Sequence, residues 1–110
     1  MANHEFGIMP HDPAPDRRYD EYEPQRYNCI TVDDEDIEPL LTELQKVDCY
    51  WHTLRQPGKG LAYCGITLIP PTSLALFHSL LSGAGRRLEA LIHLTEKAQL
   101  ENRYIIHFGI

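Results

Sequence analysis

Two histidines lie in apolar segments that have the composition of β-strands, and they are the first candidates for chemistry. His52 follows Trp51, and His107 lies within the apolar segment 104–110. An imidazole titrates near neutral pH, so on an open sheet face it would serve as a general acid or base or hold a small ligand. A histidine in a strand is also commonly a structural residue whose ring nitrogens are hydrogen-bonded in place. The sequence favours this structural interpretation for both residues.

The cysteines offer two further kinds of site. Cys49 and His52 are three residues apart, and with Cys29, Cys64 or His107 they would supply ligands of the type that zinc prefers. Structural zinc sites normally have paired ligands at both ends, and only one mixed pair is present. Cys64 with His107 would make a nucleophile and a base, but the expected strand facing puts them on opposite faces. We therefore expect no metal and no cofactor, and we interpret the cysteines as free, inert thiols.

Two charged segments lack the pattern of an ion site. The acidic run 33–36 has neither the glycine nor the later glutamate of a calcium loop, and negative charge at that place would stabilise the start of a helix. Residues 58–60, Gly-Lys-Gly, lack the longer glycine and lysine pattern that cradles phosphate, and they have the composition of a hairpin turn. No coherent catalytic set emerges, so the sequence argues against an enzyme.

The composition is that of a soluble globular domain. Of the 110 residues, 43% are hydrophobic and 24% are charged, and no apolar segment approaches the roughly 20 residues that span a bilayer. The formal net charge of -6 would repel a phosphate backbone, so we expect neither a nucleic-acid nor a membrane partner. The first residues lack the pattern of a secretory signal, and the cysteines are odd in number. We therefore expect a cytoplasmic location.

Residues 1–26 differ in composition from the rest of the chain. They carry four of the eight prolines among many charged residues, without helical or strand periodicity. This pattern predicts an irregular N-terminal arm, part of which is apolar enough to lie across the surface of the domain that follows. Residues 27–110 are expected to form that α+β domain.

Periodicity predicts the elements of residues 27–110. Strands are expected at 27–32, 49–54, 61–69 and 104–110, and helices at 36–46 and across 72–101 with a break at 82–85. The order β-α-β-β-α-β predicts a two-layer split sandwich of ferredoxin-like type, an antiparallel sheet with helices on one face. The alternative is a three-stranded α+β domain in which 49–54 is a loop. Because 104–110 has the residues of a core strand, we expect the chain to be a complete single domain.

Alternation within the predicted strands assigns side chains to two faces of the sheet. The even-numbered residues of 61–69 and 104–110 are expected to face the helices, and the odd-numbered ones the opposite side. The helix-free face would then be too apolar to remain bare. Its candidate contact residues are Tyr27, Trp51, His52, Leu61, Tyr63, Ile105 and His107.

These observations predict a noncatalytic binding or regulatory module that acts through the helix-free sheet face. Such a face would make a homo-oligomer, contact a protein partner or hold a small-molecule ligand. The alternative is a small enzyme with a histidine acid or base between the sheet and the N-terminal arm. In a third, purely structural interpretation, Phe6, Ile8 and Met9 of the arm cover the sheet and leave no site.

The cysteine pattern generates a direct prediction. Thiol titration of the denatured, unreduced protein should count three free thiols, because the spacing provides neither a disulfide framework nor paired zinc ligands. Elemental analysis should find no stoichiometric zinc. One zinc per chain whose removal by a chelator unfolds the protein would contradict this interpretation.

Overall fold

A six-stranded sheet runs through the part of the chain that the structure describes, in the order β2-β1-β6-β5-β3-β4, with every neighbouring pair antiparallel. The computed structural model describes residues 2–84 and 86–110, apart from the side chain of residue 86. The strands are β1 (Asn3–Ile8), β2 (Ile30–Asp33), β3 (Asp48–Trp51), β4 (Pro57–Lys59), β5 (Ile66–Ile69) and β6 (Ile105–Phe108). The chain is thus a small α+β domain built on an open antiparallel sheet.

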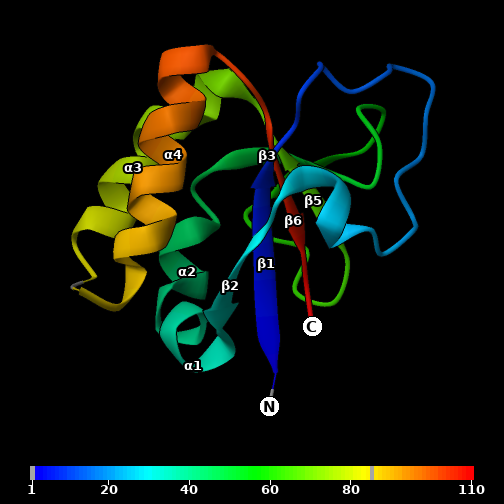
Figure 1. Cartoon of the computed structure of the whole chain (residues 1–110). Coiled ribbons are helices and arrows are strands. Elements are labelled where there is room, and N and C mark those ends of the chain that lie inside the picture. The colour runs from blue at the N-terminus through cyan, green and yellow to red at the C-terminus, as the bar shows by residue number, and fades with distance from the viewer. Residues whose placement is uncertain (1, 85) are drawn as a thin grey trace.

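The helices pack on one face of this sheet (Figure 1). They are α1 (Asp34–Ile37), α2 (Leu41–Leu44), α3 (Leu74–Ser82) and α4 (Glu89–Glu101). The helix expected at 36–46 is instead divided into α1, a 3-10 turn (Glu38–Leu40) and α2, because Pro39 has no amide hydrogen to continue an α-helix. Among the described residues, no helix has the length and apolar character needed to cross a membrane.

Residues 3–8 differ from the irregular arm expected for 1–26, because they form β1 near the middle of the sheet. β1 pairs with β2 on one side, where His4 lies opposite Val32, and with β6 on the other, where Phe6 lies opposite His107. Phe6 is fully buried against the helices. The first proline of the arm is Pro10, so nothing in residues 3–8 prevents strand pairing.

The strand order also differs from the ferredoxin-like order expected from the sequence. In that arrangement the predicted strands 27–32 and 61–69 would be the central neighbours. Instead β2 lies at one edge, and β6 lies between β1 and β5. The three-stranded alternative is not found either, since 49–54 contributes to β3.

Both faces of the central strands are buried, and their facing is the reverse of the one expected. Ile105 and Ile69 belong to the core on the helix side, whereas Ile106 and Phe108 belong to a second core on the opposite face. All four residues of β5 and all four of β6 are buried. When both faces are buried, a strand has no polar side to fix its orientation, so alternation cannot assign the facing.

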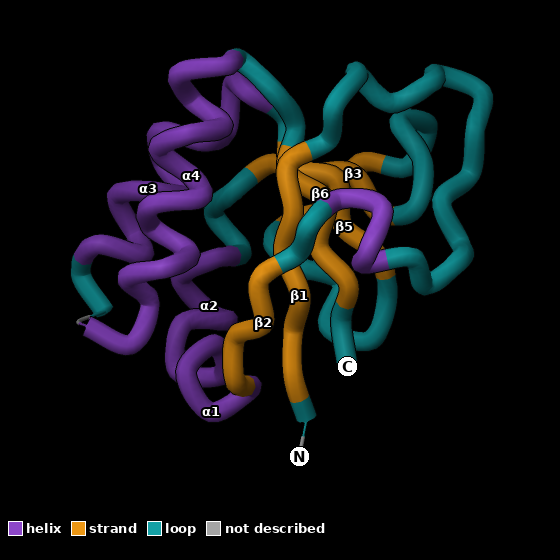
Figure 2. Tube along the Cα trace, in the orientation of Figure 1, coloured by secondary structure: helices purple, strands orange, loops and turns teal. Residues whose placement is uncertain are grey.

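The second core lies beneath the covering segment, which we define as residues 9–29. Figure 2 shows it as a long loop on the side of the sheet away from the helices, with one short helical turn (Pro24–Tyr27). Met9 and Tyr19 are buried there against Ile106 and Phe108. The helix-free face expected from the sequence therefore exists, but the chain itself covers much of it.

Gly7 allows the covering segment to approach β1 closely. A Cβ atom at position 7 would lie 2.7 Å from the Cβ and carbonyl oxygen of Tyr27 and 2.8 Å from Sγ of Cys29. Gly7→Ala should therefore displace residues 24–29 and lower the free energy of unfolding by about 1 to 3 kcal/mol, the usual cost of overpacking. Urea denaturation measures this loss, and faster tryptic cleavage at Arg17 and Arg18 would report the displaced segment.

The matched control for this prediction is Gly83→Ala. A Cβ there would meet its nearest neighbour, the Leu80 carbonyl oxygen, at 3.7 Å, and Gly83 has a helical φ of -78°. The control should be as stable as the parent chain or slightly more stable. Equal stability of the two variants would show that the segment does not depend on close packing at Gly7.

Candidate functional site

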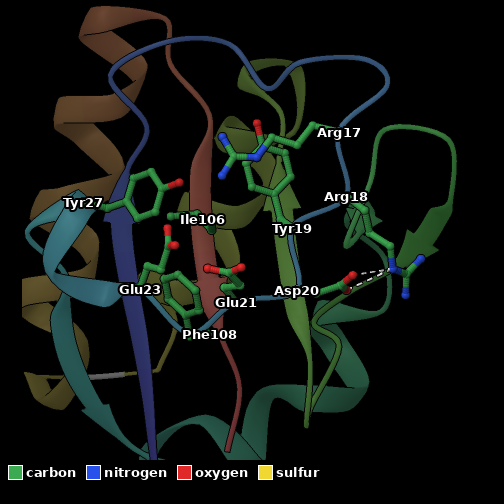
Figure 3. A pocket seen from close by; sticks show the side chains of 9 residues that line it. All are labelled: Arg17, Arg18, Tyr19, Asp20, Glu21, Glu23, Tyr27, Ile106 and Phe108. Atoms are coloured by element: carbon green, nitrogen blue, oxygen red, sulfur yellow. Dashed lines mark hydrogen bonds and ion pairs between the residues drawn. The ribbon is translucent and has the colours of Figure 1, made fainter.

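A pocket lies between the covering segment and the helix-free face of β6 (Figure 3). We call it the arm pocket. Ile106 and Phe108 of β6 contribute its apolar floor, and Tyr19 and Tyr27 stand on either side. Its cavity volume is about 230 Å³. The complete lining is Arg17, Arg18, Tyr19, Asp20, Glu21, Glu23, Tyr27, Ile106 and Phe108.

Opposite charges stand at different sides of the arm pocket. In Figure 3, Arg17 lies on one side of Ile106, and Glu21 and Glu23 lie on the other. The Arg17 guanidinium also lies over the Tyr19 ring, 4.6 Å from its centroid. This stacking holds a cation at the pocket wall without neutralising it.

Three of the charged side chains that line the pocket are already in ion pairs. Arg18 binds Asp20 at 2.8 Å. Arg26 binds Glu23 at 2.9 Å, and this bond, followed by a side-chain hydrogen bond between Glu21 and Glu23, lowers the pKa of the Glu23 carboxyl. Within the described residues, Arg17 and Glu21 form no ion pair. Glu21 is hydrogen-bonded to Glu23 but has no cationic partner, so Arg17 and Glu21 are the side chains left to pair with the opposite charges of a bound molecule.

His52 attaches the covering segment to the end of β3. Its ring Nδ1 lies 3.0 Å from the Tyr19 carbonyl oxygen and 3.0 Å from Oδ1 of Asp20, while its carbonyl accepts the Tyr19 amide at 2.6 Å. Its Nε2 side faces Gly65, where a Cβ would approach to 2.7 Å. A positive φ of 67° places the backbone of His52 in the left-handed region. His52 is therefore a residue that positions Tyr19, not a free acid or base.

The other predicted histidine, His107, lies on the helix side of the sheet in a chain of hydrogen bonds. Its Nδ1 is 3.1 Å from Oγ1 of Thr67, and its Nε2 is 2.8 Å from Nδ1 of His4. Nε2 of His4 is 2.9 Å from Oδ1 of Asp34, and the Tyr63 hydroxyl donates to Oδ2 of Asp34 at 2.7 Å. We call these five residues the histidine chain. It connects β1, β5, β6 and the start of α1.

Donor and acceptor roles along the histidine chain follow one direction. An ionised Asp34 accepts from Tyr63 and from Nε2–H of His4, so Nδ1 of a neutral His4 can accept Nε2–H of His107. Nδ1 of His107 then accepts the hydroxyl hydrogen of Thr67. The Thr67 oxygen accepts the amide of Ala62 at 2.8 Å. Every polar atom named has a partner, which is what burial requires.

The pKa shifts agree with these roles. Burial, followed by the proximity of His4, lowers the pKa of His107 well below its usual range. Hydrogen bonds from Tyr63 and His4 lower the pKa of Asp34, and the bond to Asp34 raises the pKa of Tyr63 to about 12. A neutral His107 and an ionised Asp34 are the expected forms at neutral pH.

The two imidazoles of the histidine chain are closed to solvent, whereas Asp34 and Tyr63 at its other end are partly exposed. His4, Thr67 and His107 are each 0% exposed, and the chain does not line the arm pocket. General acid or base catalysis needs contact with the reacting molecule. The burial of His107 therefore favours its structural interpretation over a catalytic one.

The remaining predicted contact residues do not converge on one site. Leu61 packs against the helix-side core and Ile105 is fully buried within it. Trp51 donates from Nε1 to the Gly60 carbonyl at 3.0 Å. Of the seven residues proposed from the sequence, Tyr27 alone lines the arm pocket.

Sequence reasoning missed Arg17, Tyr19 and Glu21. The available signal was the alternation of tyrosines with charged residues across 17–27, which is unusual for a purely solvated arm. His4 was also missed, because a strand at 3–8 was not expected.

The cysteines are unpaired with one another, and their environments differ. Burial raises the pKa of Cys29 and that of Cys49 to about 12, so both thiols stay protonated, while Cys64 is exposed. Among residues 2–84 and 87–110, no group of three or more histidine, cysteine or acidic side chains is placed to hold a metal ion.

The fold and the pocket together define a small α+β domain with a ligand-sized hollow beneath its own N-terminal segment. Comparisons with models of protein families, with curated proteins and with solved structures found no match. The function must therefore be argued from the geometry alone.

The bond between Tyr63 and Asp34 generates a prediction. Tyr63→Phe removes the largest cause of the lowered pKa of Asp34, so this pKa should rise toward its ordinary value of about 4. A carboxyl with a lowered pKa stabilises the folded state above that ordinary value and loses this effect as the pH falls. The stability difference between parent and variant should therefore be larger at pH 7 than at pH 3.

Carboxyl NMR titration measures the pKa of Asp34 directly. Tyr104→Phe is the control, because it removes a hydroxyl that packs near the second core on the other face of the sheet. An unchanged Asp34 pKa in Tyr63→Phe would disprove the hydrogen bond as its cause.

Proposed function

We propose that the protein is a noncatalytic binding module and that the arm pocket holds a small zwitterion with an apolar group, such as a free apolar α-amino acid. The carboxylate of such a ligand would pair with Arg17 and its ammonium group with Glu21. Its apolar part would rest on Ile106 and Phe108 between the two tyrosines. The observation that carries this proposal is the presence, beside one apolar floor, of Arg17 and Glu21, two side chains of opposite charge type that form no ion pair among the described residues.

The size of the pocket supports a small ligand. Its volume of about 230 Å³ lies below the range of roughly 300 to 1,000 Å³ that drug-sized ligands occupy. Five of the nine lining residues are charged, so the pocket suits a small charged ligand with an apolar part more than a wholly apolar one. Side chains of the covering segment line most of the pocket, so binding would also hold that segment against the sheet.

The enzyme alternative has less support. Of the two histidines considered for an acid or base site, His52 lies near the covering segment with Nδ1 occupied by Tyr19 and Asp20. His107 lies on the other face of the sheet and is buried. Neither is available to a molecule in the arm pocket.

A homo-oligomer or a protein partner remains a prediction with a weaker basis. That prediction depended on a bare helix-free face, and residues 9–29 now account for much of the apolar area there. Sedimentation of the parent chain tests it directly: a dimer would support the prediction, and a monomer at high concentration would contradict it.

The zwitterion proposal is tested with three matched probes. L-phenylalanine carries both charges, its amide lacks the carboxylate, and N-acetyl-L-phenylalanine lacks the ammonium group. Amide NMR titration should show the strongest binding for L-phenylalanine, with shifts at Tyr19, Tyr27 and Phe108. Loss of one charge-assisted hydrogen bond should weaken binding by about tenfold or more.

Two variants assign the charges. Glu21→Gln should weaken the binding of L-phenylalanine and of its amide but not that of the acetyl derivative. Arg17→Gln should weaken the binding of L-phenylalanine and of the acetyl derivative but not that of the amide. Lys46→Gln, at an exposed position after α2, is the control and should change none of the three affinities. Absence of shifts at the pocket residues with all three probes at millimolar concentration would refute the proposal.

A further inference from the structure

In the histidine chain the imidazoles of His4 and His107 are in direct contact inside the protein. Among the described residues, Asp34 provides the one carboxylate that is hydrogen-bonded to them. Nδ1 of His4 and Nε2 of His107 are 2.8 Å apart, and the two rings are stacked with centroids 5.1 Å apart. Both side chains are fully buried. The pair lies across the junction of β1 and β6, so its state bears directly on the pairing of these two strands.

Counting protons shows why this pair is sensitive to acid. With both rings neutral, one nitrogen of the contact donates and the other accepts. A first added proton can be shared along the pair, because Asp34 lies 2.9 Å from His4 and supplies the opposite charge. A second proton would place two N–H donors against each other at 2.8 Å, with no second carboxylate beside His107. The folded state therefore resists double protonation.

The groups that face the pair confirm this count. From β1, His107 meets His4 and the apolar ring of Phe6, whose centroid is 4.8 Å away. From β5 it meets Thr67, which does not titrate near neutral pH. His4 is hydrogen-bonded to Asp34 of α1, and its ring packs near that of Tyr63 in the loop before β5. The charge of Glu38 acts at longer range and contributes to the raised pKa of Tyr63. Asp34 is thus the one carboxylate in hydrogen-bond contact with the pair among the described residues.

We infer that the His4–His107 pair is an acid-sensitive latch: uptake of the second proton breaks the side-chain bond between β1 and β6 and releases β1 together with the covering segment that follows it. The covering segment begins at Met9, directly after the last residue of β1. The same release would open the arm pocket, but the latch does not depend on what that pocket binds.

The sign of the effect follows from burial. His107 stays neutral in the folded state and takes up its proton more readily when unfolded, so falling pH favours the unfolded or opened state. The loss begins below the ordinary histidine pKa of about 6.5. For each additional proton bound by the opened state, the opening equilibrium constant should rise up to tenfold per pH unit.

The first test is the pH dependence of urea denaturation of the full chain between pH 7.5 and pH 5. The free energy of unfolding of the parent chain should fall below about pH 6.5. In His107→Gln the slope of this free energy against pH should be smaller by the equivalent of about one bound proton. His93→Gln, at an exposed position of α4, should keep the parent slope. Asp34→Asn removes the compensating carboxylate, so the folded state resists the first proton as well and the loss of stability below about pH 6.5 should be steeper than in the parent chain. Equal slopes for the parent chain and His107→Gln would overturn the inference.

The second test needs no variant, so it stands even if His107→Gln fails to fold. Amide hydrogen exchange of the parent chain, corrected to protection factors, compares β1 with α4 at pH 7.5 and pH 5.5. Protection of β1 should fall by a larger factor than protection of α4. An equal fall in both elements would mean that acid destabilises the whole domain uniformly, and it would overturn the latch.

Discussion

The pairing of β1 with β6 is the constraint on which the other features of the structure depend. It joins residues 5–8 to residues 105–108 inside the sheet. Because β1 ends at Ile8, the chain must leave the sheet there, and residues 9–29 cross the helix-free face before β2 begins. The same pairing places His4 against His107. One strand contact thus produces the cover, the pocket beneath it and the buried polar network.

The two polar clusters of the molecule have complementary properties. The histidine chain has groups that can transfer protons, but His4, Thr67 and His107 are fully buried. The arm pocket is open to solvent, but its charged groups are guanidinium and carboxylate groups that favour binding over proton transfer at neutral pH. Catalysis needs reactivity and access in the same place. Their separation onto opposite faces of the sheet is the physical reason for preferring a binding module to an enzyme.

The sequence was sufficient for the class of fold and insufficient for the topology. Strong local signals predicted the strands near 66–69 and 105–108 and the helices of 74–82 and 89–101, because apolar periodicity there is long or uninterrupted. Strand order depends on contacts between distant residues, and no local pattern encodes the pairing of Phe6 with His107. The facing of β6 was reversed for a different reason, since both of its faces are buried. The pocket was missed because its charged residues lie in a proline-rich segment that resembles a solvated arm.

The position of β1 also has a consequence for how the chain folds during synthesis. Residues 3–8 are made about a hundred residues before their neighbour β6, so the middle of the sheet stays incomplete until translation has passed residue 108. Contacts between such distant segments slow folding, because a long loop must close before the contact forms. Until then, β1 and β5 each expose an unpaired edge of the kind that pairs with other chains. These edges leave the nascent protein open to pairing with other chains until β6 has formed.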